Sequence, residues 1–245
     1  MLTPLLSSSL NKSSASISLV IFIVCILLSN AASAGVTIFD TVSTVNKDTK
    51  LTALTQGRFF PEGGKLVTFY VNSKKIGTTL SGGDGYAFLK YKSSSRGIKS
   101  LQAESGEHRD EGTLLITEKK DKVILIEIES TLFDSLLSFR ADKESRGALT
   151  ELSKNFRVIY ISSLIGIAQS KKWLHDNEFP LSAVLKWEGS ELIDDLKEKG
   201  IPLYAIIASP DLLSDASNIE KRFSFTETED ATEVRDWDEL IDSLE

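Results

Sequence analysis

The polar residues best able to do chemistry follow buried-looking apolar runs in the second half of the chain. Glu127 and Glu129 come after one such run, in an acid-x-acid-x-Thr order that ends at Thr131. Ser162 and Ser163 come after the next run. Ligands of open parallel sheets bind beyond the carboxyl ends of the strands, so we expect these side chains to share one site. Carboxylate oxygens there would bind hard cations such as Mg²⁺ or Ca²⁺.

A parallel sheet is needed to bring these residues together, and the second half of the chain has the rhythm of one. After the charged connector at 118–122, apolar strand-like runs alternate with helix-like stretches, which is typical of α/β domains. Asp211 and Asp215 follow the fourth strand-like run and are expected at the same edge. The predicted strands are 123–126, 158–161, 183–185, 203–208 and 222–225, and the predicted helices are 147–155, 167–177, 190–199, 212–221 and 236–244.

The first half of the chain has a different pattern, with short β-type runs separated by Gly, Asn, Ser and Asp clusters. Residues 66–71 alternate, placing Val67, Phe69 and Val71 on one face. Polar turns then permit hairpins into the runs that follow. This pattern predicts an antiparallel β-sandwich, with strands near 51–55, 66–71, 75–80, 86–91, 98–104 and 112–117.

The same half resembles bacterial immunoglobulin-like (Ig-like) repeats of surface and exported proteins. The matching features are Gly57, the sequence Pro-Glu-Gly at 61–63, Lys-Ile-Gly at 75–77 and Asp-Gly-Tyr-Ala at 84–87. Such modules act as spacers or adhesive units, so the resemblance implies a protein partner for this domain and no catalysis.

The second-half motifs resemble the haloacid dehalogenase (HAD) superfamily of phosphatases. In that family the first strand ends in Asp-x-Asp-x-Thr, the second in Ser or Thr, and a Lys precedes the fourth strand. Residues 158–174 and the Phe-Pro pair at 179–180 are also similar to the C-terminal domains of lipins and phosphatidylinositol-transfer proteins. The resemblance implies a Rossmann-like α/β fold that binds a phosphorylated small molecule or a lipid headgroup.

The resemblance also implies a role for each position. Glu127 takes the place of the nucleophile and Glu129 that of the acid/base, while Thr131 matches the family directly. Substrate-binding positions are Thr131, Ser162, Ser163, Lys197 and Lys199, and positions near a Mg²⁺ cofactor are Glu127, Glu129, Asp211 and Asp215.

Both family aspartates are glutamates here, and the extra methylene displaces each carboxylate by roughly 1 Å. A misplacement of about 1 Å can cost on the order of 10²-fold in rate, so we expect phosphatase turnover to be nearly lost. Glutamate still binds hard cations through its carboxylate oxygens, so we expect metal binding to survive the loss of turnover.

The N-terminus predicts export. Lys12 precedes an unbroken apolar run at 19–28, and Ala-Ser-Ala at 32–34 is a small-residue cleavage site before Gly35. The apolar run is about half of the roughly 20 residues that cross a bilayer, so no stable membrane span is expected after cleavage. Cys25 lies inside this run and would leave with it. We predict a signal peptide (1–34), an Ig-like domain (35–118) and a HAD-like domain (119–245) in a periplasmic or secreted protein.

Charge narrows the partners. The formal net charge of -7 becomes -8 without residues 1–34, whose only charged side chain is Lys12. An acidic surface disfavours nucleic acid as a partner.

Three functional hypotheses follow. The leading one is an exported HAD-like pseudophosphatase that binds a ligand or a partner. The alternatives are an active Mg²⁺-dependent phosphomonoester hydrolase and a structural or adhesive envelope protein.

Overall fold

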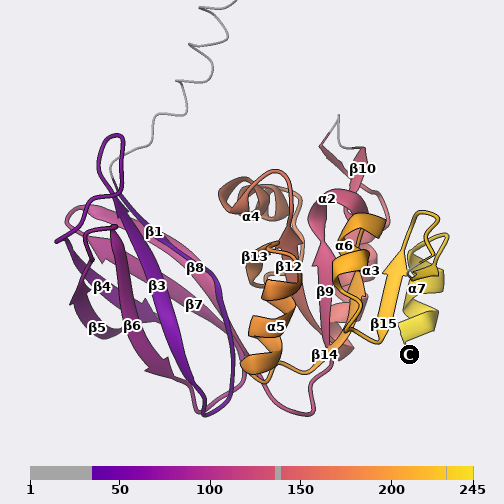
Figure 1. Cartoon of the computed structure of the whole chain (residues 1–245), viewed down its shortest axis with the longest axis horizontal. Helices are drawn as coiled ribbons and strands as arrows, with labels where there is room; N and C mark the ends of the chain where they lie inside the picture. The colour runs from indigo at the N-terminus through magenta and orange to yellow at the C-terminus, as the bar shows by residue number, and fades with distance from the viewer. Residues whose placement is uncertain (1–34, 136–138, 230, 245) are drawn as a thin grey trace, which may run out of the picture.

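The computed structural model describes residues 35–135, 139–229 and 231–244 of the chain. They form a β-sandwich followed by a domain with a parallel sheet and flanking helices (Figure 1). The predicted combination of a sandwich and a parallel α/β sheet is therefore confirmed. The predicted signal peptide and Cys25 lie outside the described residues. Within the described part, no helix is both long enough and apolar enough to span a membrane.

The sandwich consists of two sheets. One contains β1 (Gly35–Ile38), β3 (Asp48–Gln56) and β6 (Tyr86–Lys92), in the order β1-β3-β6. The other has the order β2-β8-β7-β4-β5, with β2 (Thr41–Thr44), β8 (His108–Thr117), β7 (Gly97–Ser105), β4 (Leu66–Val71) and β5 (Lys74–Leu80). Strand β3 alternates between exposed and buried residues, the period-2 pattern of a half-buried strand. The inward residues, including Leu51, Val67, Phe69 and Leu101, make the core between the sheets.

The parallel sheet has the order β13-β12-β9-β14-β15-β16. Its strands are β9 (Val123–Glu127), β12 (Arg157–Ser162), β13 (Val184–Lys186), β14 (Leu203–Ile207), β15 (Lys221–Ser224) and β16 (Thr232–Glu233). All five residues of β9 are buried, as expected for a central strand covered on both faces. The chain adds β12 and β13 on one side of β9 and then β14 to β16 on the other, so the strand order reverses at β9.

Helices cover both faces of this sheet. They are α2 (Ile128–Thr131), α3 (Ser145–Asn155), α4 (Ile167–Asp176), α5 (Ser190–Glu198), α6 (Pro210–Asp215) and α7 (Trp237–Leu244), and a small hairpin joins β10 (Phe133–Ser135) to β11 (Arg140–Ala141). One hydrophobic cluster contains residues of α3 and α7, and the opposite cluster contains residues of α5 and α6. Helix α6 is shorter than the predicted 212–221, and α2, which begins directly after Glu127, was not predicted.

The two domains share a hydrophobic core. Val42 of β2 and Leu115 of β8 are buried in the same cluster as Ile193 and Leu196 of α5. Strand β2 belongs to the sandwich, where it pairs in parallel with β8. Because burying each such side chain contributes about 1.5–3 kcal/mol, this contact holds the sandwich and the α/β domain together.

Candidate functional site

The carboxylate of Glu127 lies at the carboxyl end of β9 and is almost fully buried, with 3% of the residue exposed. Its Oε1 accepts a hydrogen bond from Ser163 Oγ at 2.7 Å. Its Oε2 accepts from Ser130 Oγ at 2.6 Å and from the backbone N–H of Ser209, after β14, at 2.7 Å. Glu127 thus ties together the ends of β9, β12 and β14.

Glu129, at the start of α2, is equally buried, with 2% exposed. Its Oε1 accepts from Ser162 Oγ at 2.9 Å and from the backbone N–H groups of Leu164 and Ile165, both at 3.1 Å. The N–H and Oγ of Ser163 donate to its Oε2 at 3.2 and 3.3 Å. Successive backbone N–H groups of this kind form an anion-binding concavity. Here the protein's own carboxylate occupies it.

The hydroxyl groups predicted to bind substrate are engaged within the protein. Thr131 Oγ1 donates to the carbonyl oxygen of Glu127, one helical turn back. Ser162 Oγ is buried between Glu129 and Ser170, whose Oγ donates to it at 2.8 Å. We name the set Glu127, Glu129, Ser162 and Ser163 the acid clamp, since its hydrogen bonds hold the loop after β12 against the start of α2.

The predicted lysines lie at the other end of the sheet. Helix α5 runs back from the carboxyl edge, so Lys197 and Lys199 lie beside the start of β14. Lys197 Nζ donates to the carbonyl of Asn218 at 2.6 Å, and Lys199 pairs with Asp195. Neither cation takes part in the acid clamp.

The predicted metal ligands do not form a cluster. Asp211 and Asp215 are exposed on α6, and no group of three or more potential ligand residues occurs in the part of the chain that the structure describes. The lone pairs of Glu127 and Glu129 already accept internal hydrogen bonds. Mg²⁺ requires near-ideal octahedral oxygen coordination, which these two carboxylates could supply only by giving up those hydrogen bonds. Binding of Mg²⁺ stays a prediction.

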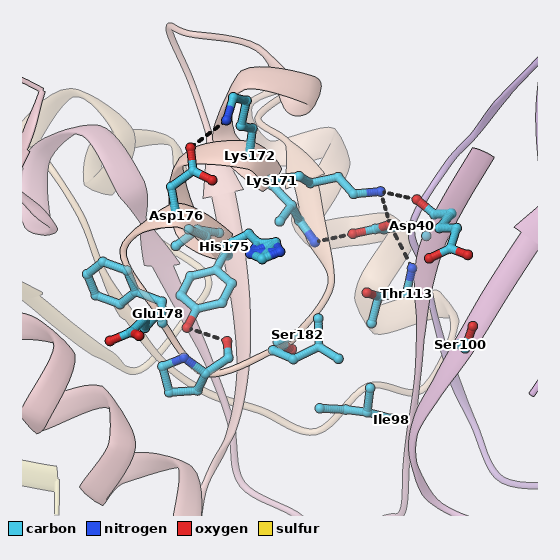
Figure 2. A pocket seen from close by; sticks show the side chains of 18 of the residues that line it. Asp40, Ile98, Ser100, Thr113, Lys171, Lys172, His175, Asp176, Glu178 and Ser182 are labelled. Atoms are coloured by element: carbon cyan, nitrogen blue, oxygen red, sulfur yellow. Dashed lines mark hydrogen bonds and ion pairs between the residues drawn. The ribbon is translucent and has the colours of Figure 1, made fainter. Parts of the chain in front are cut away.

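A second candidate site, missed by the sequence analysis, is a cleft of about 1020 Å³ between the two domains (Figure 2). The sandwich contributes Asp40, Ile98 and Thr113, and α4 contributes Lys171 and His175 among others. Figure 2 shows charged side chains of both signs along its upper part and Ile98 near its base.

Asp40 fixes one wall of the cleft. Its side chain has no exposed surface. The carboxylate accepts hydrogen bonds from Thr113 N at 2.8 Å, from Lys171 Nζ at 2.9 Å and from Val184 N of the edge strand β13 at 2.9 Å. Lys171 also donates to the carbonyl of Glu111 at 2.9 Å. The acid therefore joins both domains and covers an otherwise free N–H of the sheet edge.

The polar rim of the cleft is solvated. Lys172 and Asp176 form an exposed ion pair of 2.6 Å on α4, and the hydrogen bond from Lys172 lowers the pKa of Asp176. Deeper in the wall, Tyr160 donates to the carbonyl of Pro180 at 2.9 Å. Burial raises the pKa of Tyr160, so this phenol stays protonated. In the sequence, Asp40 is a single acid that follows a short apolar run, and nothing else there indicates its role in the cleft.

Comparison with known proteins gives matches to β-sandwich modules of solved structures. No family model and no curated protein matches the chain. The CARDB domain of PF1109 from Pyrococcus furiosus is 15% identical, with a TM-score of 0.28, over 34% of this chain and 93% of that domain. The D00-D0 domain of intimin is 16% identical, with a TM-score of 0.27, over 32% of this chain and 42% of that one. Fibronectin(III)-like modules of Clostridium thermocellum CbhA are 15% identical, with a TM-score of 0.26, over 34% of this chain and 46% of that one.

The identification with the HAD superfamily is wrong, and with it the descriptions HAD-like, phosphatase-like and pseudoenzyme. The similar structures named above are β-sandwich modules, and none is a phosphatase. The resemblance depended on polar residues that follow parallel strands, an order that any sheet with a polar carboxyl edge can have. In this structure the glutamates bind the protein's own backbone and the lysines lie at the opposite edge.

Proposed function

We propose that the protein is a non-catalytic structural or adhesive protein of the cell envelope that binds a protein partner in the cleft between its two domains. Export to the envelope is part of this proposal. For the second domain we retain the proposal of a doubly wound, Rossmann-like sheet, which the reversal of strand order at β9 supports.

The observation that carries the proposal is the cleft itself, which combines an apolar base with a polar rim on a rigid frame. Ile98 of the sandwich and Leu181 of the α/β domain both line it, with 46% and 70% of each residue exposed. Charged residues of both signs also line the cleft, among them Asp40, Lys171 and Lys172. An apolar centre within a polar rim is the anatomy of protein interfaces.

The size of the cleft favours a polypeptide over a small molecule. Small-ligand pockets span roughly 300–1,000 Å³ and bury most of the ligand. This cleft, of about 1020 Å³, lies at the top of that range. Its walls come from both domains, so the shared core around Val42 and Leu115 presets its shape, which lowers the entropy cost of binding.

The acid clamp supports a structural role for the residues expected to do chemistry. Glu127 and Glu129 accept hydrogen bonds from serine hydroxyl groups and from backbone N–H groups of the loops after β12 and β14, and no salt bridge to either is found among the described residues. A carboxylate held in this way is neither a free nucleophile nor a free base.

Binding to isolated cell envelopes tests the proposal. Purified residues 35–245 should bind saturably, and mild trypsin treatment of the envelopes should remove the protein component of that binding. Replacing Leu181 by Asp should lower the trypsin-sensitive affinity at least tenfold, because a charge in the interface core costs about 1.4 kcal/mol or more. Phe88→Asp is the matched control, since Phe88 is 45% exposed and lies outside the cleft.

A phosphatase assay tests whether the protein is non-catalytic. Residues 35–245 should not hydrolyse generic phosphomonoesters with or without Mg²⁺. Metal-dependent turnover that Glu127→Gln abolishes would overturn the proposal. Equal envelope binding by the Leu181→Asp and parent proteins would remove the cleft from it.

A further inference from the structure

Large hydrophobic side chains project from loops and strand ends at one end of the molecule. Phe59 and Phe60, in the loop between β3 and β4, are 74% and 79% exposed. Leu66 and Leu80, paired at the adjacent ends of β4 and β5, are 64% and 60% exposed. Leu164, in the loop after β12 of the other domain, is 69% exposed. We name these five residues the apolar end.

Contacts between the domains place these groups on the same side. Asp40, before β2, contacts Val184 of β13, while Thr44 at the end of β2 donates to the carbonyl of Lys199, beside the start of β14. Strand β2 therefore runs toward the amino edge of the parallel sheet. The start of β1 and the loop after β3 consequently point toward its carboxyl edge, where Leu164 lies. Figure 1 shows the upper end of β1 on the same side as α2 and β10.

The sandwich loop is held rigidly in its exposed position. Gly57 N donates to the carbonyl of Phe60, and Glu62 N donates to the carbonyl of Thr55, both at 2.9 Å. Thr55 Oγ1 also bonds Ser81 Oγ at 2.9 Å, which ties this loop to the neighbouring turn. The two phenylalanines thus stay exposed although burial would be favourable.

The acid clamp does the same for the second loop. Glu129 accepts hydrogen bonds from the backbone N–H groups of Ser163, Leu164 and Ile165. This fixes the backbone on both sides of Leu164 while its side chain stays in solvent. Each domain therefore presents apolar side chains from a backbone that hydrogen bonds hold in place.

The chain outside the described residues also joins the molecule at this end. Gly35 pairs with Gln56, the residue directly before the sandwich loop. The 34 preceding residues contain the apolar run 19–28, which is of the composition that enters membranes. Whether that segment is present or has been cleaved, export brings Gly35, and the loop beside it, to a bilayer surface.

We propose that the apolar end lies against the lipid bilayer, with Phe59, Phe60 and Leu164 inserted at the boundary between headgroups and acyl chains. A fluid surface can accept side chains from separate loops of two domains, whereas a folded partner would need a matching shape across both. Arg58 suits this placement, because its guanidinium lies 5.3 Å from the Phe59 ring and can reach the headgroup phosphates. The proposal does not depend on the partner cleft.

Flotation with vesicles of pure phosphatidylcholine tests this inference. Residues 35–245, which contain all the described cores, should float with the vesicles and do so equally at low and high salt, because the protein is acidic and the contact apolar. The double variant Phe59→Ser, Phe60→Ser should lower the partition coefficient at least tenfold. The Leu164→Ser variant, which changes the α/β domain, should lower the partition coefficient severalfold.

Leu181→Ser is the matched control. Leu181 is 70% exposed, lies in the same domain as Leu164 and is not at the apolar end, so its replacement should leave flotation unchanged. Circular dichroism melts verify that each variant is folded. Absence of flotation by the parent protein, or equal effects of Leu164→Ser and Leu181→Ser, would overturn the inference. Trypsin-sensitive envelope binding that requires Phe59 and Phe60, without vesicle binding, would assign the apolar end to a protein partner instead.

Discussion

Replacement of Glu129 by Gln perturbs the acid clamp with almost no change in shape. Both carboxylate oxygens accept hydrogen bonds, Oε1 from Ser162 Oγ and from two backbone N–H groups, and Oε2 from Ser163. Gln keeps one acceptor oxygen and turns the other position into an NH₂ group that faces donors. One set of donors in a buried site therefore loses its acceptor.

The expected cost follows from two contributions. Hydrogen bonds to a charged group contribute about 1.5–3 kcal/mol, and a buried donor left without a partner costs about 1–3 kcal/mol. We expect a loss of about 3–5 kcal/mol in the free energy of unfolding, a large share of the roughly 5–15 kcal/mol of a typical domain. At about 2–4 °C per kcal/mol for a chain of this size, the Tm should fall by about 6–20 °C.

Urea unfolding followed by circular dichroism measures this loss, with the m value compared between variants. Glu188→Gln is the control, because Glu188 is exposed and forms only a surface ion pair with Lys186. It should change stability by no more than about 0.5 kcal/mol. A loss below about 1 kcal/mol for Glu129→Gln would refute the reasoning, since it would mean that the carboxylate is not the charged acceptor that holds the loop.

Three further predictions concern the frame of the molecule. Asp40→Asn should cost about 2–4 kcal/mol in urea unfolding, because it leaves Lys171 without its buried partner. The pKa of Tyr160 is raised by burial above its ordinary value of 10.0, so the unfolded chain releases this proton at a pH where the folded chain keeps it. The contribution of Tyr160 to the free energy of unfolding is therefore fully present below pH 10 and is lost as the pH rises further. The Tyr160→Phe variant should show a flatter dependence of the free energy of unfolding on pH between about pH 9 and pH 11. Gly63→Ala should cost at least about 2 kcal/mol in a thermal melt, because its Cβ would lie 2.2 Å from the Gly82 carbonyl oxygen, whereas Gly83→Ala, with open space around it, should be neutral.

The sequence pattern was sufficient to predict the two kinds of sheet. Val67, Phe69 and Val71 alternate and are all buried in the sandwich, while the continuous apolar run of β9 is buried on both faces. Each pattern reports directly which sides of a strand are covered. The strands β1 and β2 were not predicted as separate elements, because each is only four residues long and β2 is buried by the other domain.

The candidate site was predictable only in part. Glu127, Glu129, Ser162 and Ser163 come together because they follow adjacent parallel strands, which sequence order alone indicates. The sequence also shows that both acids are glutamates, whose side chains reach one methylene further than those of aspartates. It could not show that this reach ends on the N–H groups of the loop after β12, since backbone donors leave no mark in the sequence.

The lysines and Asp40 illustrate two other limits. Lys197 and Lys199 were assigned to the site by resemblance, but α5 ends at Glu198 beside the start of β14, at the opposite edge. Asp40 is decisive for the domain interface because of Thr113, Lys171 and Val184, residues more than 70 positions away. Contacts of that range have no local pattern.

Because Val42 and Leu115 share a core with α5, we expect the two domains to be kept together in evolution. If a gene rearrangement moved the sandwich alone into another protein, Val42 and Leu115 would lose the apolar side chains that cover them. Asp40 would lose its ion pair with Lys171. Such a fragment would tend to aggregate before it could acquire a new neighbour. We likewise expect one heat-absorption peak on heating rather than two, because melting of either half would expose the shared core.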